Sequence, residues 1–554
     1  MEDNIFTFIV GGKAGEGVKK AGEIAAHLFM EEGLQVFLMD DYMSLIRGGH
    51  NFTVVSTANR EINSQYLNAD VLVVSDKRSF ENHKDHLSSK GILIYNSEEI
   101  EFISGIPIPF SSMVKEYKVK GLIYGVGAVA SLAASISYDK PKLLQLIEDE
   151  YPSGKEDNLK FAGEIYDMVN EKLDKPFSLP SGNKKGSFLT GNQAISLGAI
   201  AAGLDSYYAY PMTPASSILH YLASLAPDFG ISVVHPESEI AVINMAIGSA
   251  FAGARSMVGT SGGGFALMTE GFSLAGMAES PILVILSMRC GPATGVPTYT
   301  EQADLNFAIS AGHGDFLRIV ASPTSIQQAF YLSAEMLDLV WKYQSPGILL
   351  TDKHLSESAM SVDLDPNKCA WAESKLFDGE GEYKRYLDTE DGISPLLFPP
   401  SKQLIKWNSY EHDELGITTE NPEKIVLMHE KRYKKDENLI EYLKRKQTLE
   451  VIRGDIPWNI FTYGSTYMSV KEALKYGNIN PTIVAPIYLS PLPVWELKEF
   501  RRDNNLVIEQ SISGQFSKLL KEKAGLQIRK TIKKYDGRPF DPITLSNKIK
   551  EVIS

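Results

Sequence analysis

Short apolar runs alternate with amphipathic stretches along most of this chain. Ile5–Val10 is an apolar run that leads into a glycine cluster, and the next stretch, Val18–Met30, carries apolar residues at helical spacing. This series predicts a strand, a glycine turn and a helix. Further strand candidates are Gln35–Met39, Val71–Asp76 and Gly91–Asn96. The pattern predicts an N-terminal α/β domain with a largely parallel sheet over residues 1–178.

The rest of the chain divides by composition. Residues 179–187 lie in a stretch rich in Pro, Gly, Ser and Lys, which predicts a linker. Over residues 188–357, apolar strands alternate with Ala/Gly-rich helical stretches, so we expect a second α/β domain there. Residues 358–446 are more polar and predict an irregular insertion. In residues 447–554, apolar strand candidates again alternate with helical stretches, which predicts a further α/β domain. We therefore expect a multidomain α/β protein.

Composition narrows the class of protein. The 554 residues are 44% hydrophobic, and 55 basic against 69 acidic side chains give a formal charge of −14, which disfavours a nucleic-acid partner. We find no leader-like N-terminus and no run of ~18–20 apolar residues, so we expect a cytoplasmic protein without a membrane partner. The two cysteines, Cys290 and Cys369, are too few to hold an iron–sulfur cluster. Any such cluster has to lie on another chain.

Two glycine clusters in the first domain are ambiguous. Gly11–Gly17 lies between a predicted strand and a predicted helix, where free backbone N–H groups can hold an anion. It lacks the GxGxxG spacing, although Asp40 lies about where a ribose-binding carboxylate would stand. A tight turn with close helix packing explains the same glycines equally well. The run Arg47–His50 is too short to indicate a ligand by itself.

A more specific motif is Tyr210-Pro211-Met212-Thr213-Pro214, which follows an apolar strand and precedes a helical pattern. Two prolines fix the backbone around Thr213, so its hydroxyl can be held at the carboxyl end of a strand, where α/β sheets bind ligands. The motif resembles the Tyr-Pro-Ile-Thr-Pro sequence of 2-oxoacid:ferredoxin oxidoreductases, with Met212 in place of the usual isoleucine.

The next segments follow in the order of that family. His235–Ala241 is similar to the segment whose glutamate bonds N1′ of the thiamine pyrimidine, and Glu239 is the matching residue. A carboxyl group among apolar neighbours can share a proton with that nitrogen and so activate thiamine. Glu237 is a competing candidate, and a glutamate at a helix start can also be a simple cap.

Two glycine-rich turns complete the resemblance. Thr260–Glu270 resembles the family's Thr-Ser-Gly-Pro-Gly-Phe turn, with Gly263 in place of the proline. The run Arg289–Thr298 resembles the family's Arg-Gly-Gly-Pro-Ser-Thr-Gly loop. The resemblance implies that its arginine binds the 1-carboxylate of the substrate, which a planar guanidinium can do through two parallel hydrogen bonds. The resemblance implies that Arg289 and Thr213 orient the substrate. The residues that it implies to contact thiamine diphosphate are Glu239, Tyr210, Pro211, Thr213, Ser261 and Gly262.

The resemblance covers nearly the whole chain. The first domain is similar to the family's gamma segment, and the polar insertion is typical of the fused gamma-alpha chain of 2-oxoglutarate enzymes. The tail Val507–Phe516 resembles a Glu-Gln-Asn-x-x-Gly-Gln stretch, with Ser511 in place of the asparagine, and implies a C-terminal domain like that of transketolase. We find neither a Gly-Asp-Gly motif with a downstream asparagine nor a CxxC pair. In the family both belong to a smaller beta subunit, which is implied to hold Mg²⁺ with the diphosphate and a [4Fe–4S] cluster.

The implied function is the alpha subunit of a thiamine-diphosphate-dependent 2-oxoglutarate:ferredoxin oxidoreductase, which carries out either the oxidative decarboxylation of 2-oxoglutarate with coenzyme A and ferredoxin or the reverse carboxylation of succinyl-CoA. The implied assembly is one αβ pair or (αβ)₂, and no metal ligand is assigned to this chain. Pyruvate, branched-chain and indolepyruvate enzymes, and a transketolase-like enzyme without electron transfer, remain as alternatives. A non-catalytic scaffold subunit whose glycine turns hold a nucleotide is a further one.

Overall fold

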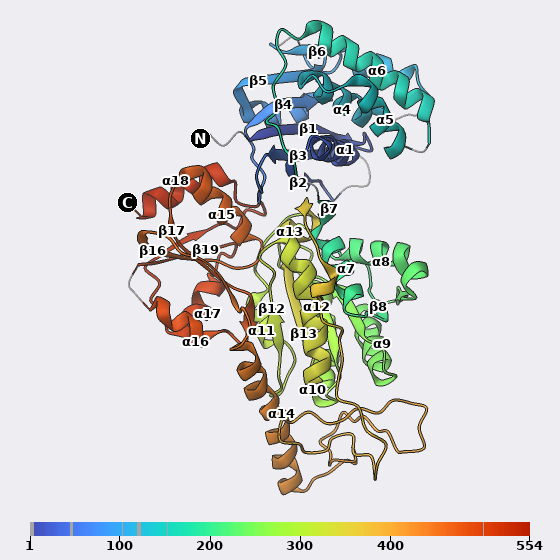
Figure 1. Ribbon diagram of the computed structural model, residues 1–554, viewed down its shortest axis with the longest axis vertical. Helices are drawn as coiled ribbons and strands as arrows, with labels where there is room; N and C mark the ends of the chain where they lie inside the picture. Colours follow the sequence, from blue (N-terminus) through green and yellow to red (C-terminus); the bar gives the residue numbers. More distant parts are fainter. Residues whose placement is uncertain are drawn as a thin grey trace.

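The computed structural model describes residues 5–44, 48–101, 104–118, 123–151, 153–184, 186–501 and 504–553. Within these ranges the strands form three separate sheets. Figure 1 shows the N-terminal unit at one end of the long axis, the second sheet below it, and the C-terminal unit beside that sheet. The chain is a multidomain α/β protein, as the sequence predicts.

The first sheet contains eight described strands in the order β6-β5-β4-β1-β3-β2-β14-β7. Their bounds are β6 (Ile106–Ile108), β5 (Leu87–Asn96), β4 (Ala69–Val74), β1 (Phe6–Ala14), β3 (Gly48–Ala58), β2 (Gln35–Asp41), β14 (Ala359–Val362) and β7 (Ser187–Thr190). The helices of this unit are α1 (Val18–Glu31), α2 (Lys77–His83), α3 (Phe110–Lys115), α4 (Ile123–Ser135), α5 (Lys140–Glu150) and α6 (Lys155–Lys172).

The first sheet is mixed, so the expectation of a largely parallel sheet holds only for the strands from β6 to β1. Strands β6, β5, β4 and β1 are parallel, but β3 lies antiparallel between β1 and β2, and β14 and β7 extend the antiparallel half. The sequence pattern does not predict β3 because buried Thr and Ser residues interrupt its short apolar run, and because the strand begins within the glycine run Arg47–His50. Arg47 itself lies outside the described residues.

The second sheet contains seven described strands in the order β18-β12-β13-β11-β10-β8-β9. Their bounds are β18 (Tyr488–Ser490), β12 (Ile319–Ala321), β13 (Gly347–Asp352), β11 (Ile282–Met288), β10 (Ser256–Thr260), β8 (Ser206–Tyr208) and β9 (Ser232–Val234). All except β18 run parallel. Every residue of β11 is buried, as expected for a central strand covered on both faces. The covering helices are α7 (Gly191–Ala201), α8 (Ser216–Phe229), α9 (Glu239–Phe251), α10 (Gly262–Met277), α11 (Leu305–Ser310), α12 (Ile326–Tyr343) and α13 (Lys353–Glu357).

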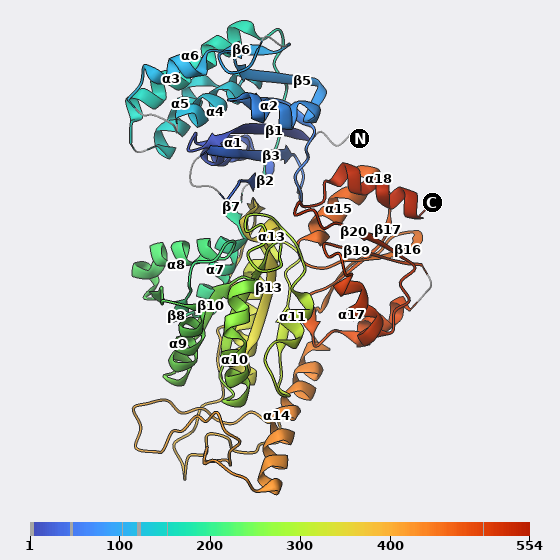
Figure 2. The ribbon, with the colours of Figure 1, turned by 180° about the vertical axis from the view of Figure 1, so that it is seen from behind.

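The third sheet contains five described strands in the order β15-β17-β16-β19-β20. Their bounds are β15 (Leu449–Ile452), β17 (Pro481–Pro486), β16 (Ile456–Phe461), β19 (Asn505–Glu509) and β20 (Lys530–Lys533). Helices α15 (Thr466–Gly477), α16 (Val494–Leu497), α17 (Gln515–Ala524) and α18 (Pro542–Ile553) surround it. Figure 2 shows this unit from behind, beside the second sheet to which its strand β18 contributes.

The polar insertion is not irregular throughout. After long loops it forms the 22-residue helix α14 (Pro422–Leu443), which leads into the C-terminal unit. Lys431 and Lys435 on this helix are buried, and their ammonium groups lie 2.8 and 2.5 Å from the carboxylate of Glu279, just beyond the end of α10. This buried charge cluster holds α14 against the second sheet. The division of the chain at residues 178, 187, 357 and 446 stays a prediction.

No helix within the described ranges is both long enough and apolar enough to cross a membrane.

Candidate active site

Four motif segments meet at one edge of the second sheet. Thr213 follows β8, Glu239 follows β9, Ser261 follows β10 and Arg289 follows β11. These four strands are adjacent and parallel, so their carboxyl ends lie side by side. Ligands in open α/β sheets bind at this edge, because the loops that leave it converge there. The sheet therefore brings together residues that are up to 76 positions apart in the sequence.

Glu239 is the first residue of α9. Ser238 caps the helix, since its hydroxyl accepts a hydrogen bond from the Ala241 N–H at 3.4 Å. The Glu239 side chain is only 5% exposed, and among the described residues the structure records no hydrogen bond or ion pair to its carboxylate. Glu237, the competing candidate, is exposed. Burial without a protein partner favours Glu239 as the residue that meets a ligand.

The turn after β10 fits closely around this glutamate. A Cβ atom on Gly264 would lie 2.8 Å from Glu239 Oε1 and 2.2 Å from Thr260 Oγ1, so only glycine leaves the carboxylate where it is. Ser261 stands at the N-cap of α10, but its hydroxyl is buried and has no hydrogen-bond partner in the described structure. An orphaned buried hydroxyl next to a helix N-terminus is a typical contact for a ligand that is not part of the chain.

Arg289 and Thr213 are in direct contact. The Arg289 guanidinium donates a hydrogen bond from Nη1 to the Thr213 carbonyl at 2.9 Å, while its buried Nε has no partner in the described structure. Burial lowers the pKa of Arg289, and the carboxylate of Asp304 partly offsets this effect. One nitrogen of the guanidinium thus fixes its orientation, and the remaining N–H donors suit the recognition of a carboxylate.

Asp304 completes this edge, although the sequence did not single it out. A Cβ atom on Gly262 would lie 2.4 Å from Asp304 Oδ2, so the carboxylate packs directly on the first turn of α10. Burial raises the pKa of Asp304 to about 6, the nearby Glu301 adds to the rise, and Arg289 opposes it. A lone aspartate fifteen positions after the arginine carries no pattern of its own, so only the fold could reveal it.

The outer rim of the site is apolar and open. Tyr210 is 39% exposed and its ring lies edge-on to His235, with centroids 5.8 Å apart, while Pro211 is half-buried. Ile240 on α9, Leu267 on α10 and Val296 in the loop after β11 are likewise exposed large side chains. Single exposed apolar residues are ordinary, but several of them in the segments that form one site are the pattern of an interaction surface or a ligand-binding groove.

The first glycine cluster contains its own anion. The carboxylate of Glu16 accepts hydrogen bonds from the Lys13 N–H at 2.8 Å and from the Ser75 hydroxyl at 2.7 Å. Gly12 must lack a side chain, because a Cβ atom there would lie 2.6 Å from the same carboxylate. The turn is therefore filled by the protein, which weighs against the reading of Gly11–Gly17 as a nucleotide site.

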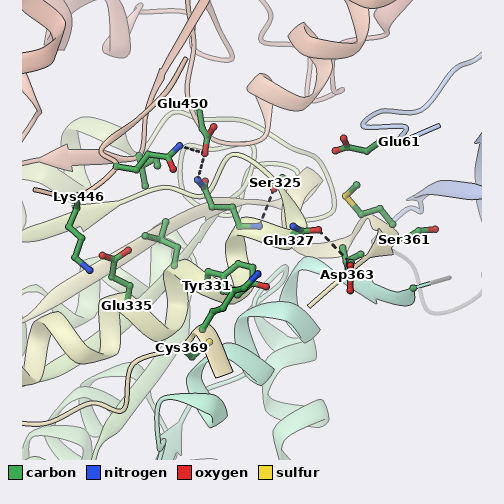
Figure 3. A pocket seen from close by; sticks show the side chains of 18 of the residues that line it. Glu61, Ser325, Gln327, Tyr331, Glu335, Ser361, Asp363, Cys369, Lys446 and Glu450 are labelled. Carbon is green, nitrogen blue, oxygen red and sulfur yellow. Dashed lines mark hydrogen bonds between the residues drawn. The ribbon is translucent and has the colours of Figure 1, made fainter. Parts of the chain in front are cut away.

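A large cavity lies elsewhere. It has a volume of about 720 Å³ and is formed where the first sheet, α12 and the end of α14 meet. Figure 3 shows the carboxylates of Glu335 and Glu450 and the ammonium group of Lys446 around it. None of the strand-end residues described above lines this cavity. The chemistry of the strand ends, not cavity size, therefore makes this edge the candidate active site.

The residues present fit thiamine diphosphate in part. The unpaired Glu239 carboxylate suits the pyrimidine, and the orphaned Ser261 hydroxyl offers a polar contact beside it. The sequence has no Gly-Asp-Gly motif that could hold a metal-bound diphosphate. This chain can therefore hold one half of the cofactor.

Comparison with known proteins agrees with this geometry. A family model described as "Pyruvate flavodoxin/ferredoxin oxidoreductase, thiamine diP-bdg" matches residues 197–431, and one described as "Pyruvate ferredoxin/flavodoxin oxidoreductase" matches residues 7–168. The chain is 30% identical to a 2-oxoacid:ferredoxin oxidoreductase subunit alpha from Sulfolobus sp, over 96% of this chain and 95% of that relative. It is 38% identical to the 2-oxoglutarate synthase subunit KorA of Archaeoglobus fulgidus, over 39% of this chain and 64% of that one.

A solved structure is similar over the full length. It is the 2-oxoglutarate:ferredoxin oxidoreductase from Magnetococcus marinus with 2-oxoglutarate, coenzyme A and succinyl-CoA bound, with a TM-score of 0.91, 31% sequence identity and complete coverage of both chains. Fold, motif order and sequence identity agree, and the chain belongs to the alpha subunits of the thiamine-diphosphate-dependent 2-oxoacid:ferredoxin oxidoreductases.

Proposed function

We propose that this chain is the alpha subunit of a 2-oxoglutarate:ferredoxin oxidoreductase, which forms succinyl-CoA, carbon dioxide and reduced ferredoxin, or runs the reverse carboxylation. The observation that carries the proposal is the convergence of a buried, unpaired Glu239 and the Arg289–Thr213 contact at the ends of adjacent parallel strands. Support for the substrate comes from the full-length similarity to an enzyme solved with 2-oxoglutarate and coenzyme A.

Each residue has a separate task in this proposal. Thiamine diphosphate, when bound, supplies a carbon that becomes nucleophilic once its proton is lost. Glu239 holds a proton at its carboxylate and exchanges it with the pyrimidine, which a buried carboxyl group does well because no water competes. Arg289 binds the substrate 1-carboxylate through its free donors, while its bond to the Thr213 carbonyl keeps the guanidinium in one orientation. The Thr213 hydroxyl and the Ser261 hydroxyl line the same edge, and Tyr210 and Pro211 flank it.

The proposal requires a beta subunit. It would supply the Mg²⁺–diphosphate site and a [4Fe–4S] cluster, through which electrons leave singly to ferredoxin. The exposed apolar side chains of Tyr210, Ile240, Leu267 and Val296 around the site support an interface with that subunit. We propose an αβ or (αβ)₂ assembly in which the cofactor lies between the chains. The isolated alpha chain should then be inactive.

Two glutamate variants test the role of Glu239. The chain is co-expressed with its beta subunit, and reduction of a viologen dye is measured with 2-oxoglutarate and coenzyme A. Glu239→Gln should lower kcat by at least about a hundredfold, since proton transfer contributes roughly 10²–10⁴ in rate. Glu237→Gln is the matched control, because this side chain is exposed, and it should keep its activity. Loss of activity in the control alone would mean that the assignment is displaced by two residues.

A substrate panel tests the substrate. The same complex is assayed with 2-oxoglutarate, pyruvate, a branched-chain 2-oxoacid and indolepyruvate. We expect the highest kcat/KM for 2-oxoglutarate. A higher value for any of the others would reassign the enzyme within the family and leave the roles of Glu239 and Arg289 in place.

A further inference from the structure

The loop that carries Arg289 is tied to two other parts of the chain through one residue, Arg538. This loop, residues 289–299, leaves β11 and closes on itself: the Cys290 N–H donates to the Tyr299 carbonyl at 3.1 Å, and the Val296 N–H donates to the Cys290 carbonyl at 2.9 Å. Tyr299 therefore fixes the far end of the loop that begins at the substrate-binding arginine.

Tyr299 is held by the C-terminal unit. The Arg538 guanidinium lies over the Tyr299 ring, 3.8 Å from its centroid, and donates a hydrogen bond from Nη2 to the phenol oxygen at 2.6 Å. The next residue in sequence, Thr300, donates its backbone N–H to the Gly537 carbonyl at 3.1 Å. Gly537 has a positive φ of 76°, and a Cβ atom there would lie 2.7 Å from the Tyr299 ring. The turn at 537–538 is thus shaped to the tyrosine.

The other side of Arg538 meets the N-terminal unit. Its Nη1 forms an ion pair with the carboxylate of Asp41, the last residue of β2, which is buried. One planar guanidinium therefore contacts the first sheet with one nitrogen and the substrate-binding loop with another. A lysine lacks both the flat face that lies on the Tyr299 ring and the two separate nitrogens that reach Asp41 and the phenol oxygen.

We propose that Arg538 is a positioning residue that couples the N-terminal unit to the loop carrying Arg289, so that the docking of this unit sets the affinity for the 2-oxoacid. This inference rests on the proposed role of Arg289 in binding the substrate carboxylate. When the Asp41–Arg538 pair is formed, the guanidinium is held flat on Tyr299 and the loop is ordered. When the pair opens, Tyr299 loses its support and Arg289 loses its orientation.

The kinetic test uses the αβ complex with Arg538→Ala, Arg538→Lys, Tyr299→Phe and Asp41→Asn. Because a hydrogen bond to a charged group orients the loop, we expect Arg538→Ala to raise KM for the 2-oxoacid about tenfold to a hundredfold with kcat nearly unchanged. Arg538→Lys preserves the charge and the fold, and should raise KM less. Asp41→Asn should raise KM in the wild-type background and add nothing in the Arg538→Ala background, because it acts through the arginine.

A second readout does not depend on catalysis. Cys290 follows Arg289 directly, and Cys369 is the only other cysteine of the chain, so Cys369→Ser leaves a single thiol in the loop. In the full alpha chain, Arg538→Ala and Asp41→Asn should speed the reaction of Cys290 with an aromatic disulfide several-fold. The control is Arg529→Ala, which removes an arginine of the same unit that lies over Trp458 at 5.7 Å and bonds Asn504, away from the loop. It should leave the thiol rate unchanged.

The outcomes are distinct. If the complex oxidises no 2-oxoacid but the thiol rates change as described, the proposed function fails and the coupling of the loop stands. If KM and thiol rate of Arg538→Ala equal those of the wild type, or if Asp41→Asn keeps its full effect without Arg538, the coupling is overturned and the activity assignment is unaffected.

Discussion

The tight fit between Gly264 and Glu239 allows the carboxylate that we propose to be catalytic to be displaced without removing it. Gly264→Ala adds one methyl group in the first turn of α10. That Cβ atom would lie 2.8 Å from Glu239 Oε1, 3.0 Å from Glu239 Cγ and 2.2 Å from Thr260 Oγ1, and Thr260 is fully buried. Carbon contacts are optimal at about 3.5–4.0 Å, so the glutamate has to retreat by about 1 Å.

The effects on stability and on rate should differ in size. Overpacking costs about 1–3 kcal/mol, and the better helix propensity of alanine returns about 0.5–1 kcal/mol. A displacement of about 1 Å in a catalytic group costs on the order of a hundredfold in rate. We therefore expect Gly264→Ala to fold with a slightly lower Tm and to lose about two orders of magnitude in kcat.

Gly263→Ala is the matched control for this experiment. It adds the same methyl group one position earlier in the same turn, where the nearest atom, the Ala293 carbonyl oxygen, is 3.9 Å away. The assay is viologen reduction by the αβ complex, together with thermal unfolding of both variants. Wild-type kcat in a folded Gly264→Ala complex would refute the reasoning, since it would mean that the position of Glu239 does not govern the reaction.

Three further perturbations have directions that follow from the structure. Arg289→Lys should raise KM for the 2-oxoacid at least about tenfold, because an ammonium lacks the planar, spaced donors with which a guanidinium bonds the Thr213 carbonyl and a substrate carboxylate in fixed directions; an unchanged KM would exclude this residue as the carboxylate site. Burial raises the pKa of Asp304 to about 6, so ionisation of this carboxyl group lowers the stability of the fold as the pH rises from about 4 to 6. Asp304→Asn should therefore show a smaller fall in Tm over this pH range than the wild type. Parallel Tm curves for the two proteins would contradict this prediction. Burial by itself would raise the pKa of Glu279, but Lys431 and Lys435 hold that pKa well below its usual range. Glu279→Gln should therefore lower the free energy of unfolding by about 3–5 kcal/mol and speed proteolysis within α14. An unaltered rate of cleavage would argue that this charge cluster does not anchor α14.

Much of the fold could be predicted because the pattern of each element is local. The run Ile282–Met288 is apolar except for Ser287 and lies in the range where the sequence predicts apolar strands, and the predicted Val18–Met30 helix ends within one residue of the observed end at Glu31. The strand Gly48–Ala58 was missed, because its alternation of Thr, Ser and apolar residues is weak and its pairing partners lie far away in the sequence. This strand accounts for two of the antiparallel pairings of the first sheet, and β14 accounts for the other two.

The motifs at Thr213, Glu239 and Arg289 were legible in the sequence for a similar reason. Each depends on residues within a few positions, such as two prolines around a threonine or an arginine followed closely by a Gly-Pro pair. A local motif does not reveal which residues surround it in the folded protein. The sequence could not distinguish Glu239 from Glu237 by chemistry, but burial of the first and exposure of the second separates them.

The sequence by itself therefore determined the α/β class, the order of the strand-end motifs and the absence of a diphosphate motif, because these are properties of short segments. Only the tertiary structure decided that Asp304 packs on Gly262, that Glu16 fills the first glycine turn, and that Arg538 joins Asp41 to Tyr299. Such contacts join residues as far as 497 positions apart. The physical reason is that a charged side chain takes its role from the partners that folding brings within a few ångströms, and no local pattern records those partners.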